Sequence, residues 1–382
     1  MLSFPRNTGP LYFIYLLFLI AAFFAGNINV LYVSEFLSVG VLFYFSFSKN
    51  GLLIFLRNYF NLAAVLLLTV CIYVSGAEIY TFLVIIKIVL LFKLFSAYEV
   101  DEKDLLKFTN QTYLVYFTIC LLNYFYVISI GSLGEFNAFS ETIAGISFVT
   151  LFSFEGSTAG IDSYSGLIFI INVLLNKDLK SKKCMSGISL FALLWTTRMT
   201  PIVATLGAFV YYYVYPLSLI YVLPIFIFLQ FSLIIWLQGQ SDLIRFFFSA
   251  ITHARSSMWT QHLEVFLETL SLREFFFSTY DDRYLVRVYG FQAETSNPHN
   301  SYLLLLYNSV IGFLILTYLF LKRASNISNS RWKTLIFFIL VAAVTNSKII
   351  GLGNPVYIIL TTYFFYWSLP NSFRDSFILQ KC

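Results

Sequence analysis

Apolar runs of about 20 residues follow one another along almost the whole chain, and this pattern constrains the fold more than any other feature. A helix of that length crosses about 30 Å of hydrocarbon. The chain is 59% hydrophobic and 11% charged, whereas a soluble domain is about 25% charged. The sequence therefore predicts an all-α integral membrane protein, a polytopic helical bundle that forms a single domain over residues 1–382.

We expect about twelve transmembrane helices, with cytoplasmic loops marked by Lys and Arg. The basic stretches NKDLKSKK and KRASNISNSRWK mark two such loops. Both termini then face the cytoplasm, and two long loops, 131–162 and 238–298, face outward. The expected helices span residues 11–26, 29–47, 55–76, 79–97, 112–130, 163–176, 186–198, 201–215, 217–237, 300–321, 333–350 and 355–369.

One segment of this topology can be interpreted in two ways. Residues 195–216, WTTRMTPIVATLGAFVYYYVYP, could form part of one long span, which would place the second basic stretch outside the cell. Pro201 suits the first turn of a new helix and disfavours a helical residue before it. We therefore expect a turn near Arg198 and two short helices.

The outer loop 238–298 contains arginine but no lysine. A guanidinium group binds phosphate or carboxylate through two parallel hydrogen bonds, which an ammonium group cannot do. The alternative is that these arginines pair with acidic residues of the same loop. The arginines concerned are Arg245, Arg255, Arg273, Arg283 and Arg287.

The same loop carries a helical pattern in RSSMWTQHLEVFLETLSL. We expect its apolar face, formed by Trp259, Leu263, Phe266, Leu267 and Leu270, to lie on the bundle or on the membrane surface. Ser256 or Ser257 is the expected N-cap, with Arg255 at the edge of the first turn. His262 lies on this surface helix, outside the matching motifs.

Two charged residues fall inside expected spans. Glu35 and Lys87 lie at similar calculated depths, about 9–12 Å below the outer face. A charge in hydrocarbon is costly, so we expect an ion pair between them, with a role on a substrate path as the alternative.

Motifs for nucleotide or metal chemistry are missing from the sequence. It contains no phosphate-binding glycine loop, no H-E-x-x-H pair and no cysteine cluster. His253, His262 and His299 show no close ligand spacing. We expect no metal, no cofactor and no nucleic-acid partner.

Three stretches in the second half of the chain resemble the bacterial family of O-antigen polymerases and ligases, membrane glycosyltransferases of the GT-C class. They are TTRMTPIVATLGAF with Arg198, RSSMW with Arg255, and PHNSYLLLLYNSVIG with His299 and Asn300. The sequence departs from the family pattern at Val310, where a glycine is usual, and it lacks an arginine before SFEGSTAGIDSYSG.

The resemblance implies an enzyme of surface polysaccharide and lipopolysaccharide biosynthesis in the bacterial inner membrane, with its active site facing the periplasm. The modest outer loop favours a polymerase that joins undecaprenyl-pyrophosphate-linked repeat units, and a ligase that transfers glycan to lipid A-core is the alternative. Its partners would be the lipid-linked donor and acceptor, membrane lipid and a chain-length regulator. A flippase or other transporter of lipid-linked oligosaccharide is a further alternative.

The resemblance also suggests a role for each matching residue. Arg198 and Arg255 would bind the pyrophosphate, and His299 would orient or deprotonate the acceptor hydroxyl or donate to phosphate. Asn300 would hold the start of its helix and contribute to substrate binding. Arg283 and Arg287 are further substrate-binding candidates. The sugars, the linkage and the oligomeric state are not readable from the sequence.

Overall fold

A computed structural model describes the larger part of the chain. The described residues are 9–23, 28–47, 86–87, 90–95, 98, 100–129, 140–143, 146–149, 161–196, 199–214, 218–251, 255–270, 286–287, 294–295, 300, 302–303, 306, 310–311, 313–314, 317–318, 321, 327, 329–344, 359–360, 362–363 and 366–367.

The architecture is all-α, as the sequence predicted, with two small antiparallel strand pairs. The helices are α1 (Gly9–Phe23), α2 (Ile28–Phe47), α6 (Glu102–Ser129), α7 (Ile161–Leu174), α8 (Leu179–Trp195), α9 (Met199–Val214), α10 (Leu219–Gln238), α11 (Asp242–Ile251), α12 (Arg255–Thr269) and α16 (Ser330–Ala342). Strand β1 (Ser140–Ile143) pairs with β2 (Ile146–Val149), and β3 (Val286–Arg287) pairs with β4 (Glu294–Thr295).

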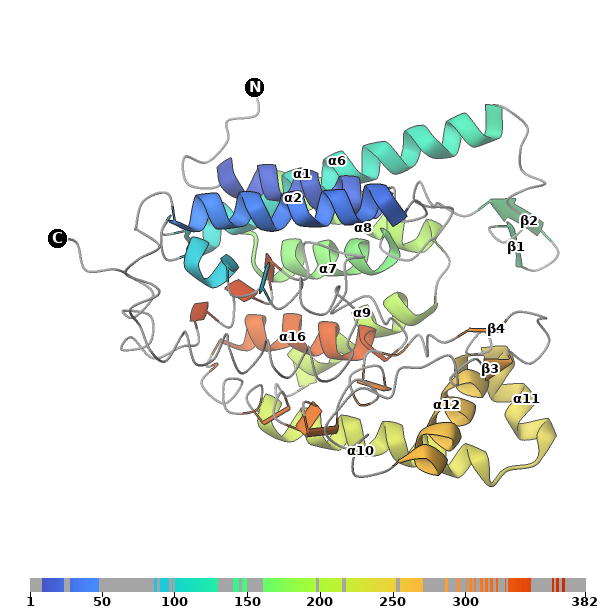
Figure 1. Cartoon of the computed structure of the whole chain (residues 1–382). Coiled ribbons are helices and arrows are strands. Elements are labelled where there is room, and N and C mark those ends of the chain that lie inside the picture. Colours follow the sequence, from blue (N-terminus) through green and yellow to red (C-terminus); the bar gives the residue numbers. More distant parts are fainter. Residues whose placement is uncertain are drawn as a thin grey trace.

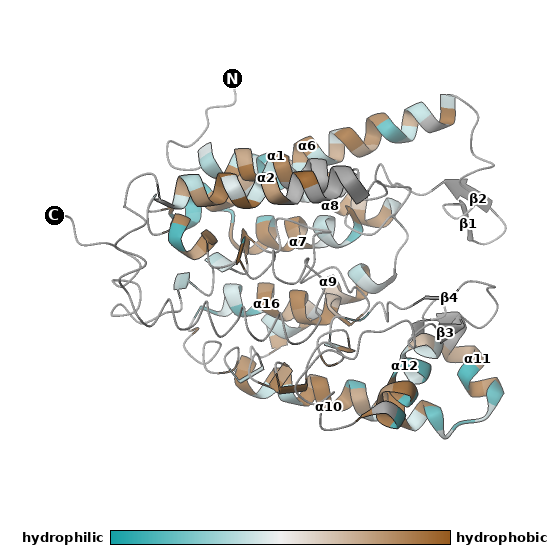
Figure 2. Cartoon of the chain, in the orientation of Figure 1, coloured by the Kyte–Doolittle hydropathy of each residue, from teal (hydrophilic) through white to brown (hydrophobic). Residues whose placement is uncertain are grey.

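The long helices lie in a stacked bundle, and the strand pairs gather with α11 and α12 at one end of it (Figure 1). Helix α7 is central, since it contacts α6, α8, α9 and α16. Apolar residues dominate the bundle helices, whereas α11 and α12 alternate apolar and polar residues (Figure 2). The end of the molecule that carries α11 and α12 therefore differs in composition from the bundle. In the predicted topology, α11 and α12 belong to the same outer loop.

Close approach at the centre of the bundle depends on a glycine. A Cβ atom at Gly166 of α7 would lie 2.8 Å from Thr205 Oγ1 and 3.0 Å from Phe338 Cζ. Beside this contact, the rings of Tyr211 and Phe337 stack with centroids 4.5 Å apart, joining α9 to α16. The absence of a side chain at Gly166 thus allows α7, α9 and α16 to pack together.

Buried hydrogen bonds join α6 to α7. The side-chain amides of Asn110 and Asn172 bond reciprocally, at 2.9 and 2.8 Å. The Tyr113 hydroxyl lies 2.9 Å from Ser165 Oγ. An unsatisfied polar group in an apolar interior is costly, so these pairs specify how the two helices align.

Two helices begin earlier than the sequence predicted. Helix α6 starts at Glu102 rather than at residue 112, because Asp101 accepts from the Asp104 N–H at 2.6 Å and caps it. Helix α8 starts at Leu179 rather than at residue 186, where Asp178 is the N-cap and accepts from the Lys180 N–H. Both expected starts were wrong because they followed hydropathy alone, and a capped helix extends into its charged flank.

Among the described residues, one helix is long and apolar enough to cross a membrane, namely α10. Shorter apolar helices lie at Phe36–Ser46, Ile161–Leu174 and Thr200–Val214. The turn expected near Arg198 agrees with the end of α8 at Trp195 and the start of α9 at Met199. Residues 195–216 are therefore not one continuous helix.

Candidate functional site

Helix α12 begins at Arg255, the arginine of the RSSMW stretch. Ser256 and Ser257, expected as N-caps, lie inside its first turn instead, so that prediction was wrong. Ser256 is buried, and Ser257 Oγ accepts from Gln261 Nε2 at 3.1 Å. Both serines therefore lie within the helix and not at the N-cap position. Arg255 is the first residue of the N-terminal turn.

The buried face of α12 is rotated from the one predicted. Its buried residues are Ser256, Met258, Trp259, His262, Leu263 and Phe266. Leu267 and Leu270, which were expected on this face, are 54% and 42% exposed. His262, on the same helix, is fully buried.

This rotation follows from what α12 packs against. Trp259, Leu263 and Phe266 form one apolar cluster with Ile234 of α10 and with Leu303. Gln238 Nε2, at the end of α10, donates to the Thr260 carbonyl at 3.0 Å. The neighbouring helix thus decides which of two apolar stripes faces inward, and the predicted stripe was only partly correct.

Asn300 caps the helical segment that begins beside it. Its Oδ1 accepts from the backbone N–H groups of Tyr302 and Leu303, at 2.9 and 3.1 Å. The side chain is fully buried, and none of the described residues accepts a hydrogen bond from its Nδ2. Asn300 therefore holds the start of this segment, while its contact with substrate stays a prediction.

The cap has a consequence for anion binding. The N–H groups of a helix N-terminus favour an anion, and this was the reason for expecting phosphate beside His299. Two of these groups, on Tyr302 and Leu303, are already used by Asn300. Phosphate binding at this end would therefore depend on side chains more than on the backbone.

The same segment is anchored to the bundle. The Tyr302 hydroxyl donates to the Leu340 carbonyl near the end of α16, at 2.9 Å. Its ring lies edge-on to Phe226 of α10, with centroids 6.1 Å apart. At the opposite end of α16, Trp332 Nε1 donates to Glu102 Oε2 at 3.3 Å. Residues 300–303 thus lie at the same end of α16 as Leu340, away from the start of α6.

Arg287 lies in strand β3, which contacts α12. In the register of the β3–β4 pair, Arg287 is directly opposite Glu294. An opposite-charge pair across antiparallel strands is the arrangement that the loop-pairing alternative predicted for these arginines. The register is compatible with that alternative, and the substrate-binding role of Arg287 stays a prediction.

Three of the predicted site residues, Arg198, Arg283 and His299, lie outside the described residues, and so does Arg273. Of the others, Arg255 and Asn300 stand within one turn of residues of the same apolar cluster, Trp259 and Leu303. The structure thus places Trp259 of RSSMW in one cluster with Leu303, which directly follows PHNSY. Arg198 directly precedes α9, whose first residue is Met199.

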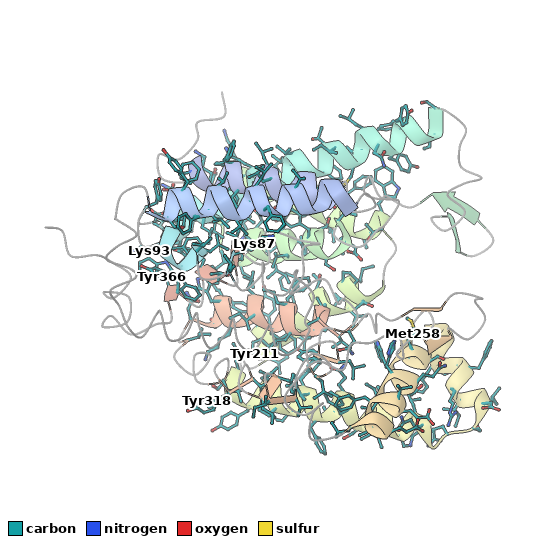
Figure 3. The ribbon with its side chains drawn as sticks, viewed as in Figure 1. Lys87, Lys93, Tyr211, Met258, Tyr318 and Tyr366 are labelled. Atoms are coloured by element: carbon teal, nitrogen blue, oxygen red, sulfur yellow. The ribbon has the colours of Figure 1, made fainter. Side chains whose placement is uncertain are left out.

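The expected ion pair between Glu35 and Lys87 stays a prediction, because the Glu35 side chain is not among those described. Lys87 is fully buried, and so is Lys93, which the sequence reasoning missed. Lys93 lies with Tyr366 on the side of the molecule away from Met258 of α12 (Figure 3). The sequence did indicate a second charged residue within the membrane, because the expected span 79–97 contains both lysines.

Gln230 is a second polar residue that sequence reasoning missed. It lies within α10 and is 7% exposed, and neither its amide nitrogen nor its amide oxygen has a hydrogen-bond partner among the described residues. A buried amide without partners is costly. Its signal in the sequence was a glutamine in the interior of an apolar run, whereas the other glutamine of α10, Gln238, stands at the end of the helix.

Within the described parts of the chain, no group of three or more His, Cys, Asp or Glu side chains could hold a metal ion. Comparison with protein-family models, with curated proteins and with solved structures gave no match to this chain.

Proposed function

We propose that this chain is a polytopic membrane glycosyltransferase that polymerises lipid-linked oligosaccharide repeat units at the outer face of the bacterial inner membrane. The observation that supports the proposal most is that residues close to Arg255 and close to His299 in the sequence pack in one cluster. Trp259, one turn after Arg255, and Leu303, one turn after His299, belong to a single buried cluster beside α10. Arg255 begins α12, and Asn300, which directly follows His299 in the sequence, caps the segment that contains Leu303.

The proposed topology keeps twelve transmembrane helices. It rests on the two basic stretches, on the break between α8 and α9, and on the gathering of α11, α12 and the strand pairs at one end of the bundle (Figure 1). The membrane places the isoprenoid chain of a lipid-linked substrate in the bilayer and its pyrophosphate at the surface. With α10 crossing the bilayer, as this topology proposes, a site at its end would lie at the membrane surface beside the pyrophosphate.

The proposed reaction joins two lipid-linked glycans. The oxygen of an acceptor hydroxyl attacks C1 of the donor sugar, and the bond between C1 and the pyrophosphate oxygen breaks. The hydroxyl proton passes to His299, and undecaprenyl pyrophosphate leaves with the bonding electron pair. Arg198 and Arg255 stabilise the negative charge that develops on the leaving group, because a guanidinium stays protonated at any physiological pH.

The test is chain lengthening by the purified full-length protein in liposomes that contain the lipid-linked repeat unit. We expect a ladder of longer lipid-linked glycans without any ion gradient. Transfer only to added lipid A-core would identify a ligase, and movement of substrate across the bilayer without lengthening would identify a transporter. Either outcome overturns the proposal.

His299 gives the sharpest test of the mechanism. His299→Ala should reduce turnover about 100-fold or more, the usual effect of losing a positioned acid or base. His299→Gln keeps a hydrogen-bond donor but is a very poor base, so activity near wild type would leave donation to phosphate as the role. His253→Ala, in the same outer loop but in no motif, is the control. His262 is unsuitable as a control because it is buried.

A transporter is the one alternative that a structural observation favours. Lys87 and Lys93 are buried within the bundle, and ionisable residues inside membrane domains commonly mark substrate paths. Substitution of either lysine by Met should abolish transport if this alternative is correct. It should leave the rate of chain lengthening per folded molecule unchanged if the lysines are structural.

A further inference from the structure

Helix α11 presents large apolar side chains to the outside of the molecule. Leu243, Phe246 and Phe247 are 79%, 72% and 60% exposed. These positions fall on one face at 3.6 residues per turn, while Asp242 and Arg245 lie on another. Such a face is unusual on a helix that water surrounds, because hydrating this apolar surface is unfavourable.

The helix is held firmly against the end of α10. Only the turn Gly239–Ser241 separates the two helices. Arg245 donates from Nε to the Leu237 carbonyl at 3.1 Å and from Nη2 to the Gln238 carbonyl. Both carbonyl groups belong to the last turn of α10, and the Leu237 carbonyl also accepts from the Gln240 N–H at 3.2 Å. The start of α11 is therefore fixed at the end of the apolar helix.

Helix α10 also carries exposed apolar side chains, and one of them contacts α11. Trp236 of α10 is 47% exposed, and its ring lies edge-on to Phe248 of α11, with centroids 5.9 Å apart. Phe228 and Ile235 of α10 are 70% and 56% exposed. Among the described helices, α10 alone is long and apolar enough to cross a membrane. Tryptophan at the end of such a helix is typical of the membrane interface.

We infer that α11 is an interfacial helix that lies in the plane of the outer leaflet, with Leu243, Phe246 and Phe247 among the lipid acyl chains. Its ten residues extend about 15 Å along the membrane surface. Asp242 and Arg245 then face the headgroups and water, as in other amphipathic helices that rest on a bilayer. The lipid bilayer is thus the partner of this face.

This docking would also position the candidate site. Helix α11 contacts α12, which begins at Arg255. A helix fixed in the leaflet holds the start of α12 at a constant depth, where the pyrophosphate of a lipid-linked substrate lies. This consequence rests on the proposed function, whereas the docking itself does not.

The test uses spin labels on the full-length protein in liposomes, after its four native cysteines are replaced by alanine. Single labels are placed at Leu243, Phe246 and Phe247, with Asp242 as the polar control and Phe228 as the control for α10. We expect the three apolar positions and Phe228 to be accessible to oxygen, which concentrates in the bilayer. They should be shielded from a water-soluble nickel complex, and Asp242 should show the reverse.

Three results would overturn the inference. Access of the nickel complex to the apolar positions would place α11 in water. Shielding from both reagents would show that protein covers this face, either a second copy or another chain. Access of the nickel complex to Phe228 would show that α10 itself is outside the bilayer. None of these measurements depends on catalysis, so a lack of polymer formation with the expected accessibilities would refute the proposed function alone.

Discussion

Replacing Gly166 by alanine tests the packing that holds α7, α9 and α16 together. The added Cβ would lie 2.8 Å from Thr205 Oγ1 and 3.0 and 3.1 Å from two ring atoms of Phe338. Carbon atoms pack most favourably about 3.5–4.0 Å apart, so either the helices or these side chains must move. Thr205 Oγ1 is tied to the Pro201 carbonyl at 2.7 Å, and Phe338 is fully buried. Neither side chain has an easy way to withdraw.

Two contributions of opposite sign determine how Gly166→Ala changes the free energy of unfolding. Overfilling a packed core costs about 1–3 kcal/mol. Alanine is favoured over glycine inside a helix by about 1 kcal/mol. Gly187→Ala in α8 isolates the second term, because a Cβ there meets nothing within 4 Å. The free energies of unfolding of the two variants should therefore differ by about 1–3 kcal/mol, with Gly166→Ala the less stable.

The measurement is equilibrium unfolding of both variants in mixed detergent micelles with increasing dodecyl sulfate, followed by tryptophan fluorescence. Gly40→Ala in α2 is a second control, since a Cβ there also meets no atom within 4 Å. If Gly166→Ala were as stable as Gly187→Ala, the three helices would not approach as closely as the structure shows. The packing argument would then be refuted.

Three further predictions concern the site and the bundle. Arg198→Lys and Arg255→Lys should lose most polymerisation activity in the liposome assay, because one ammonium cannot replace a bidentate guanidinium. Arg273→Lys and Arg287→Lys should retain it. Equal activity of all four variants would indicate that these arginines only pair with acidic side chains. His262→Ala should lower the free energy of unfolding by about 1–3 kcal/mol, since it empties a fully buried position, and wild-type stability would contradict that burial. A double-mutant cycle of Asn110→Ala and Asn172→Ala should give a coupling energy of about 0.5–3 kcal/mol because their amides bond reciprocally; simple additivity would disprove the pair.

The helical character of the chain was readable from the sequence because it depends on composition within short windows. Helices α1, α2, α7, α9 and α10 begin within two residues of the expected starts. The starts of α6 and α8 were not predicted, since Asp101 and Asp178 cap helices whose first turns are charged. Hydropathy registers only the part of a helix that is apolar.

Helix α11 was not predicted for a related reason. Its ten residues are too few for a membrane span, and the longer helical pattern of α12 dominates this loop. Six of its ten residues are large and apolar, namely Leu243, Ile244, Phe246, Phe247, Phe248 and Ile251, with Arg245 among them. Spacing could have identified an amphipathic helix here, but the outward direction of its apolar face depends on the contact with α10.

In the candidate site, too, some features follow from the local sequence and others from tertiary packing. Sequence alone determined that Arg255 stands at the start of an amphipathic helix and that Asn300 lies at the beginning of an apolar one, because helix formation and capping depend on residues a few positions apart. Only the tertiary structure decided that α12 turns Met258 and His262 inward and Leu267 and Leu270 outward. Both stripes of α12 have helical spacing, and the packing of Ile234 and Leu303 against Trp259 and Leu263 selects between them. That choice depends on residues more than 20 positions away, whose contacts no local pattern in the sequence records.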